Sequence, residues 1–149
     1  MRAVVQKVAH SSVSVDGETK GSIGKGLMVL IGVEEGDTQD DAAYLAEKIS
    51  NLWIFEDEED KLNLSVQDIG GEELAISQFT LLADARKGRR PSFVKAARPE
   101  EADALYQKVI EGIRSKGIHT EEGVFRTHMM VDICNDGPVT ILLDSHKQF

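Results

Sequence analysis

The stretch Leu74-Ala75-Ile76-Ser77-Gln78-Phe79-Thr80-Leu81 joins an apolar run, typical of a buried β-strand, to a cluster of hydroxyl and amide side chains. Buried polar groups need hydrogen-bonding partners, so this cluster either bonds to the backbone or faces a ligand. Backbone N–H groups at such a strand end could hold a developing oxyanion. Thr80 could be a nucleophile only beside a general base, and the sequence identifies none. A polar strand end without a function fits the pattern equally well.

A second unusual segment is Asn135-Asp136-Gly137-Pro138-Val139-Thr140, which sets a Gly-Pro step between two apolar runs. Proline lacks an N–H group, so it fits only the first residue of a strand, an edge or a bulge. Gly-Pro is also a step at which a cis peptide bond costs little. The simpler interpretation, favoured by the spacing alone, is a β-hairpin turn at Asp136-Gly137.

The rest of the chain predicts an α+β fold with mainly antiparallel, barrel-like β-sheets and two main helices packed on one side. Apolar periodicity predicts helices over 38–51 and from Pro99 to about Gly117, and a loop over 83–98. Strands are expected over 2–8, 11–15, 19–23, 27–31, 53–55, 73–81, 128–134 and 139–144. A chain of 149 residues is expected to form a single domain, 1–149.

Charge and composition limit the possible partners. The net charge of −9 argues against a protein that coats long nucleic acid, yet cations gather at Arg86, Lys87, Arg89 and Arg90. Such a patch suits a nucleic-acid partner touched at one end, and an exposed loop without a ligand is the alternative. No apolar run is long enough to span a membrane, and the single Cys134, expected in the core, fits a reducing, cytoplasmic setting.

The sequence contains no recognisable cofactor site. His10, His119, His128 and His146 are scattered without metal-ligand spacing, so no metal is expected. A Gly-rich phosphate loop is also missing, so no nucleotide cofactor is expected.

At the two segments described first, the sequence resembles the D-aminoacyl-tRNA deacylases, also called D-tyrosyl-tRNA deacylases. Ser77–Leu81 matches one signature of that family and Asn135–Thr140 matches the other. The resemblance runs nearly the full length, and includes the opening residues 1–8 and the stretches 51–55 and 87–93.

The resemblance implies a homodimeric hydrolase that cleaves the ester between a D-amino acid and the terminal adenosine of tRNA, without a cofactor. Gly137-Pro138 would be a cis peptide that enters the partner subunit's pocket and excludes L side chains, while glycine could still enter. Backbone N–H groups around Gln78 and Phe79 would stabilise the oxyanion. Thr80 would position the attacking water, assisted by the 2′-hydroxyl of the tRNA; the competing mechanism makes Thr80 a covalent nucleophile.

The family usually shows Phe-Gly-Ala-x-Met before its last strands, and this chain has Phe125-Arg126-Thr127-His128-Met129. Phe125 and Met129 would still line the substrate pocket, whereas Arg126 either narrows it or contacts a phosphate. Arg86, Lys87, Arg89 and Arg90 would meet the acceptor end of the tRNA. Two other functions are compatible with the residues: a non-catalytic RNA-binding module, and a generic esterase that uses Thr80 or Ser77.

Overall fold

The computed structural model describes every residue from Met1 to Phe149. Its elements follow one another as β1 (Arg2–Val15), β2 (Glu18–Ile23), β3 (Gly26–Gly32), α1 (Gln39–Asn51), β4 (Phe55–Glu56), β5 (Leu62–Leu64), β6 (Glu72–Ser77), the 3₁₀-helix η1 (Phe79–Leu82), α2 (Pro99–Arg114), β7 (Thr120–Glu122) and β8 (Met130–Asp144). None of the helices is both long enough and apolar enough to cross a membrane.

The long strand β1 organises the main sheet. Its first half, Arg2–Val8, pairs with β3, and its second half, Ser11–Val15, pairs with β2 along the same edge. Its other edge pairs with β8, and all three of these pairings are antiparallel. Beyond β3 the sheet continues through β6 to β7 in parallel pairs. The sheet curls back on itself, so that its two end strands β2 and β7 lie close together. A Cβ atom on Gly21 of β2 would lie only 3.1 Å from the Glu122 carbonyl of β7.

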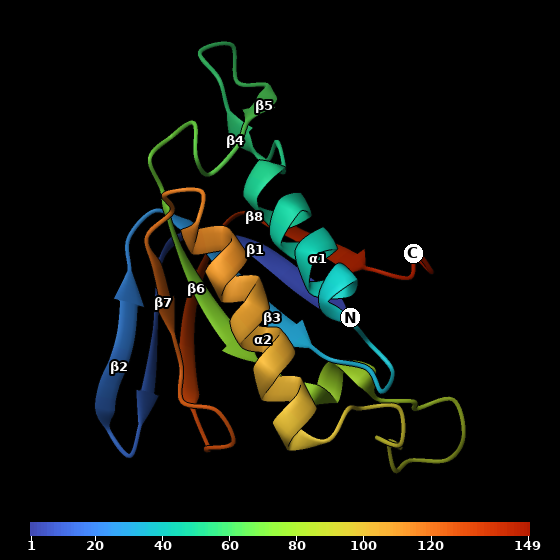
Figure 1. Cartoon of the computed structure of the whole chain (residues 1–149). Coiled ribbons are helices and arrows are strands. Elements are labelled where there is room, and N and C mark those ends of the chain that lie inside the picture. The colour runs from blue at the N-terminus through green and yellow to red at the C-terminus, as the bar shows by residue number, and fades with distance from the viewer.

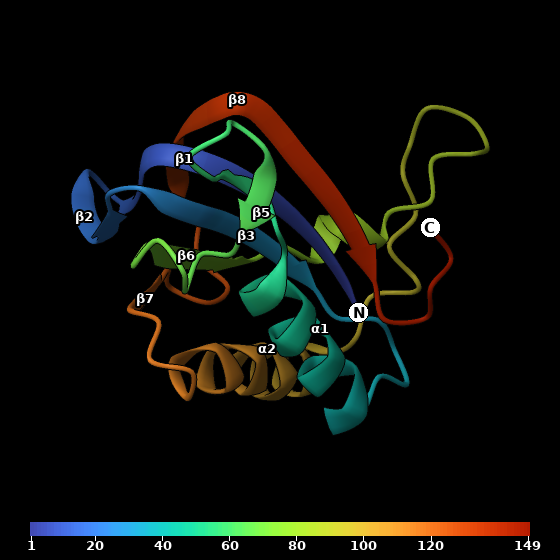
Figure 2. The ribbon, with the colours of Figure 1, turned by 90° about the horizontal axis from the view of Figure 1, so that it is seen from above.

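Figure 1 and Figure 2 show α1 and α2 side by side on one face of this curled sheet, while β8 lies on the side away from them. The alternation of side chains along β6 explains the two cores on either side of it. Ala75 belongs to the larger core under the helices, whereas Leu74 and Ile76 belong to the smaller core inside the barrel. The expected fold of two helices on a mainly antiparallel, barrel-like sheet is therefore confirmed.

Local sequence explains where the helices begin. The Asp41 carboxylate accepts a hydrogen bond from the Thr38 N–H group at 2.8 Å, which caps α1. Pro99 is the first residue of α2, where its missing N–H group has no consequence. Burial follows the helical period in α2, which places Tyr106, Val109, Ile110 and Ile113 against the sheet.

Several local predictions are wrong. The predicted pair of strands around Asp136-Gly137 is one continuous strand, β8, because both halves keep pairing with β1. The short strand β7 was not predicted, since its residues Thr120–Glu122 lack an apolar alternation. The strand of 73–81 ends at Ser77, where η1 begins two residues later. Cys134, predicted in the core, is exposed on β8.

Candidate active site at the end of strand β6

The turn from β6 into η1 positions the first family segment. Ser77 is the last residue of β6, and the Gln78 N–H group donates to the Ile31 carbonyl of β3 at 2.8 Å. Phe79 and Thr80 form the first turn of η1, which offers their N–H groups no acceptor. Both of these residues are exposed. The available donors are therefore those of Phe79 and Thr80; the expectation for Gln78 is wrong because β3 already binds its N–H group.

The side chains of this segment are ordered by a bond of their own. The Gln78 Nε2 amide donates to the Thr80 Oγ1 hydroxyl at 2.8 Å. This leaves the Thr80 hydroxyl proton free to bond to another acceptor. Thr80 can therefore orient a polar group in front of it.

A cavity of about 590 Å³ opens in front of Phe79 and Thr80. It brings together three separate segments: the β6–η1 turn, the end of the loop that leads into α2, and the turn between β7 and β8. The lining residues are Ser77, Gln78, Phe79, Thr80, Phe93, Ala96, Ala97, Pro99, Ala102, Phe125, Arg126, Thr127 and Met129. The lining includes no histidine, carboxylate or lysine, so Thr80 has no general base within it.

Phe93, Ala96, Ala97, Pro99 and Ala102 are cavity residues that sequence analysis missed. The ring of Phe93 meets that of Phe79 edge to face, with centroids 5.2 Å apart. The loop is held against β3 because the Ala97 N–H group donates to the Val33 carbonyl at 2.9 Å. The one sequence signal of this wall was an isolated aromatic residue, Phe93, in a polar loop.

Phe125 and Met129 lie in this cavity, where the sequence placed them. The ring of Phe125 stacks on that of Tyr106 at 6.3 Å. The Tyr106 hydroxyl donates to the Ala75 carbonyl at 2.6 Å, and burial raises the pKa of this phenol, so it stays protonated. Met129 approaches Gly123 so closely that a Cβ atom there would lie 2.6 Å from its sulfur.

Gly137 and Pro138 do not line the cavity of their own chain. They form a bulge in β8: Gln6 pairs with Thr140 and Val8 with Asn135, so the residues between are displaced outward. The Asn135 Oδ1 atom accepts from the Val139 N–H group at 3.2 Å, which fixes the bulge. The Gly137-Pro138 bond is cis, as expected, and both residues are exposed.

The basic loop, defined as residues 83–98, contains one arginine that is held in an ion pair and several cations that are not. Arg86 forms a two-pronged ion pair with Asp84, at 2.9 and 2.7 Å. This contact holds the pKa of the Asp84 carboxyl well below its usual range. Five other cations of this loop are exposed without such a partner and remain available: Lys87, Arg89, Arg90, Lys95 and Arg98.

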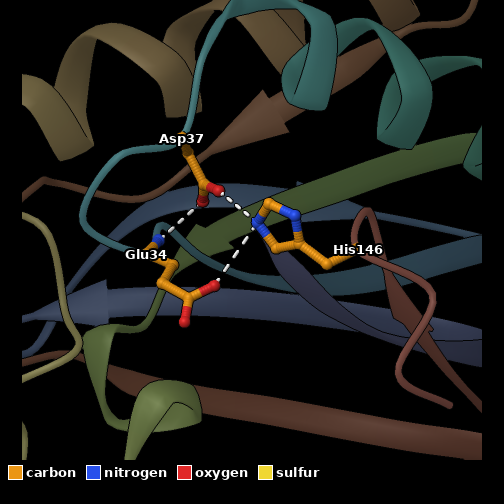
Figure 3. Close-up of side chains that lie close together, drawn as sticks. All are labelled: Glu34, Asp37 and His146. Atoms are coloured by element: carbon orange, nitrogen blue, oxygen red, sulfur yellow. Dashed lines mark hydrogen bonds and ion pairs between the residues drawn. The ribbon is translucent and has the colours of Figure 1, made fainter.

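A separate cluster, Glu34, Asp37 and His146, lies near both chain ends (Figure 3). These residues could supply three ligand atoms within 4.8 Å of one another. Protein groups already occupy Asp37: its Oδ2 atom meets the Met1 α-ammonium at 2.8 Å, and its Oδ1 atom meets His146 Nε2 at 2.8 Å. The cluster thus ties the loop after β3 to the segment after β8.

Solved structures of other proteins have the same fold as this chain. A protein named "c-Myc DNA Unwinding Element Binding Protein" superposes with a TM-score of 0.90 at 42% identity, over 97% of this chain and 98% of that one. A structure described as a probable eukaryotic D-amino acid tRNA deacylase superposes at 0.80 over 95% of this chain and 97% of that one; its 16% identity shows the fold alone. The chain thus shares its fold with both of these proteins.

The sequence then gives the family. The family model described as D-Tyr-tRNA(Tyr) deacylase matches residues 4–144. D-aminoacyl-tRNA deacylases of Natranaerobius thermophilus and Clostridioides difficile are 63% and 58% identical, each over 100% of both chains. The chain belongs to the D-aminoacyl-tRNA deacylase family, as its two segments predict.

Proposed function

We propose that this protein hydrolyses the ester bond of D-aminoacyl-tRNA and releases the free D-amino acid and tRNA. Membership of the deacylase family supports the reaction. The observation that supports the assignment of the site is the first turn of η1, because Phe79 and Thr80 line the cavity and their N–H groups have no acceptor within the chain.

The chemistry requires little beyond these donors. An aminoacyl ester is already labile, so orientation and stabilisation of the oxyanion are the main contributions. The N–H groups of Phe79 and Thr80 bind the oxyanion, and the Thr80 hydroxyl orients the reacting groups, while the tRNA 2′-hydroxyl assists the attacking water. Ser77 and Gln78 hold this turn in place, and Phe125 and Met129 contact the bound aminoacyl-adenosine. No metal takes part in this scheme.

The working unit is a homodimer whose site is shared. Gly137 and Pro138 are exposed on β8 and do not line their own cavity, so a second copy is needed to bring them to a substrate. The strand β8 supports such a contact, because three of its large apolar side chains are exposed: Met130 (63%), Ile133 (39%) and Leu142 (56%). In the partner's cavity, Gly137-Pro138 would leave no room for an L side chain, whereas glycine would fit.

The basic loop meets the acceptor end of the tRNA. Lys87, Arg89 and Arg90 would contact few phosphates, which reconciles RNA binding with a net charge of −9 and predicts a shallow salt dependence. Aminoacyl-tRNA is used in the cytoplasm, and this protein would act there.

The deciding experiment compares release of D-tyrosine and L-tyrosine from tRNA by the purified protein, with and without a chelator. Fast release from the D ester alone, unaffected by the chelator, supports a metal-free chiral deacylase. Equal release from both esters contradicts the proposed role of Gly137-Pro138. Release from neither ester leaves a nucleic-acid-binding module, a function also suggested by the name of the DNA-element-binding relative.

The generic esterase makes a different prediction. It should hydrolyse small activated esters without RNA, and Thr80→Ala or Ser77→Ala should abolish that activity. The cavity offers neither hydroxyl a base, which disfavours this mechanism.

A further inference from the structure

Arg126 is the one charged residue that lines the cavity. Its guanidinium forms no ion pair within the chain, whereas Arg86 is held by Asp84 at 2.7 Å. The side chain is exposed, so it lies at the rim of the cavity. A free cation here is conspicuous in a protein with a net charge of −9, whose overall field repels anions.

The turn that carries Arg126 is fixed on both sides of it. The Thr127 Oγ1 hydroxyl donates to the Val124 carbonyl at 2.8 Å, and Phe125 is anchored by its stack on Tyr106. Arg126 itself has a φ of +63°, a left-handed conformation that costs a non-glycine residue energy. The fold therefore holds Arg126 in a backbone conformation that costs free energy, and such strained residues cluster at binding and catalytic sites.

Another part of the cavity wall belongs to the basic loop. That loop supplies Phe93, Ala96 and Ala97 to the cavity. It also carries five exposed cations that form no ion pair: Lys87, Arg89, Arg90, Lys95 and Arg98. In Figure 1 the β7–β8 turn and the basic loop both lie at the lower edge of the molecule, near the start of α2. A strand of RNA whose end enters the cavity would thus meet cations from two segments of the chain.

We propose that Arg126 binds a backbone phosphate next to the terminal nucleotide of the RNA, at the rim of the cavity. The planar guanidinium suits two-pronged binding of phosphate oxygens. This inference rests on the proposed function, and it adds an RNA contact at the cavity itself to those proposed for the basic loop.

The test compares a substrate that has the phosphate with one that lacks it. D-tyrosyl-tRNA and D-tyrosyl-adenosine share the ester and the nucleoside, but only the tRNA has the phosphodiester. For Arg126→Gln, we expect the KM for D-tyrosyl-tRNA to rise about fivefold to tenfold at low salt, with kcat changed less than about twofold. The KM for D-tyrosyl-adenosine should not change. The slope of log KM against log salt should become shallower by about 0.7, the share of one phosphate on a single strand.

Two further variants separate binding from folding. Arg126→Lys keeps the charge and should recover part of the lost affinity. Arg126→Gly should raise the thermal midpoint, because glycine adopts the positive φ freely, while it weakens tRNA affinity as the glutamine variant does. Lys61→Gln removes a cation from the distant β4–β5 hairpin, where Lys61 is 69% exposed, and should change neither substrate.

Each other outcome overturns the proposal. Equal losses on both substrates would show that Arg126 supports the turn or touches the nucleoside, and an unchanged KM on tRNA would show that it binds nothing. If the wild-type protein hydrolyses neither substrate, the proposed function fails first. Binding of a cytidine-cytidine-adenosine trinucleotide then decides the phosphate site: equal affinity of wild type and Arg126→Gln overturns it, and about fivefold weaker binding of the variant supports it.

Discussion

The Gln78 Nε2 amide and the Thr80 Oγ1 hydroxyl lie 2.8 Å apart, and the amide donates. The hydroxyl oxygen therefore already accepts a hydrogen bond, and no histidine or carboxylate lines the cavity to remove the hydroxyl proton. Both facts favour a positioning hydroxyl over a covalent nucleophile.

For Thr80→Val, which keeps the shape and loses the hydroxyl, we expect kcat to fall about tenfold to a hundredfold, because positioning is lost while the N–H donors remain. Single-turnover deacylation of D-tyrosyl-tRNA measures this. Thr80→Ser should stay within a few-fold of wild type. A trapped acyl-enzyme in the mass spectrum of the wild type would contradict the positioning role.

Gly32 holds η1 in place by its lack of a side chain. A Cβ atom there would lie 2.6 Å from Leu82 Cδ2 and 3.0 Å from the Gln78 carbonyl. Gly32→Ala should therefore displace η1 and lower kcat by about tenfold or more, at a cost of roughly 1–3 kcal/mol in stability. Kinetics and thermal unfolding measure the two effects. Gly24→Ala, whose Cβ atom would meet only Glu72 Oε1 at 3.6 Å, is the matched control, and a normal kcat for Gly32→Ala would show that η1 tolerates the shift.

The periodicity of apolar residues predicted most of the helices and strands, because burial of one face of a helix or strand requires apolar residues at regular spacing in the local sequence. The hairpin at Asp136-Gly137 failed for a physical reason: a Gly-Pro step marks a break in regular pairing, but it does not say whether the chain reverses. Here β1 continues past the break, and β8 bulges around Gly137-Pro138 without turning back.

The candidate site was predicted only in part. Ser77 to Thr80 carry a local signal, and Phe125 and Met129 were expected from the family resemblance; all of them line one cavity. Phe93 and Ala97 could not be predicted, because their place depends on contacts distant in sequence, such as the bond from Ala97 to Val33. Gly137-Pro138 could not be joined to the cavity from one chain at all.

The burial of Glu73 leads us to expect an unusual pH dependence of the free energy of unfolding. Its two carboxylate oxygens are buried without a hydrogen-bond partner, and burial raises its pKa from 4.5 to about 8. The unfolded chain loses this proton near pH 4.5 and the folded chain near pH 8, so folding stability falls as the pH rises between these values. For Glu73→Gln we expect a stability gain over wild type that is absent below pH 4.5 and reaches on the order of 3 kcal/mol by neutral pH.

Urea unfolding from pH 4 to 8 would measure this difference. Glu72→Gln is the matched control, because Glu72 lies on the same strand but its side chain is 37% exposed. A constant difference between Glu73→Gln and wild type over the whole range would show that the carboxyl group does not titrate between the two states.

Asp37 is expected to contribute strongly to the free energy of unfolding. Its side chain and the Met1 α-ammonium are both fully buried, 2.8 Å apart, and Asp37 Oδ2 also accepts from the Glu34 N–H group at 2.7 Å. Asp37→Asn leaves the buried ammonium without its counter-charge, which costs roughly 3–5 kcal/mol. Chemical denaturation at neutral pH should show this loss, whereas Asp60→Asn, the same change at an exposed turn, should stay within about 0.5 kcal/mol of wild type. Equal stability of the two variants would mean that the Ser145 hydroxyl, which already accepts a hydrogen bond from the ammonium at 2.7 Å, is a sufficient partner without Asp37.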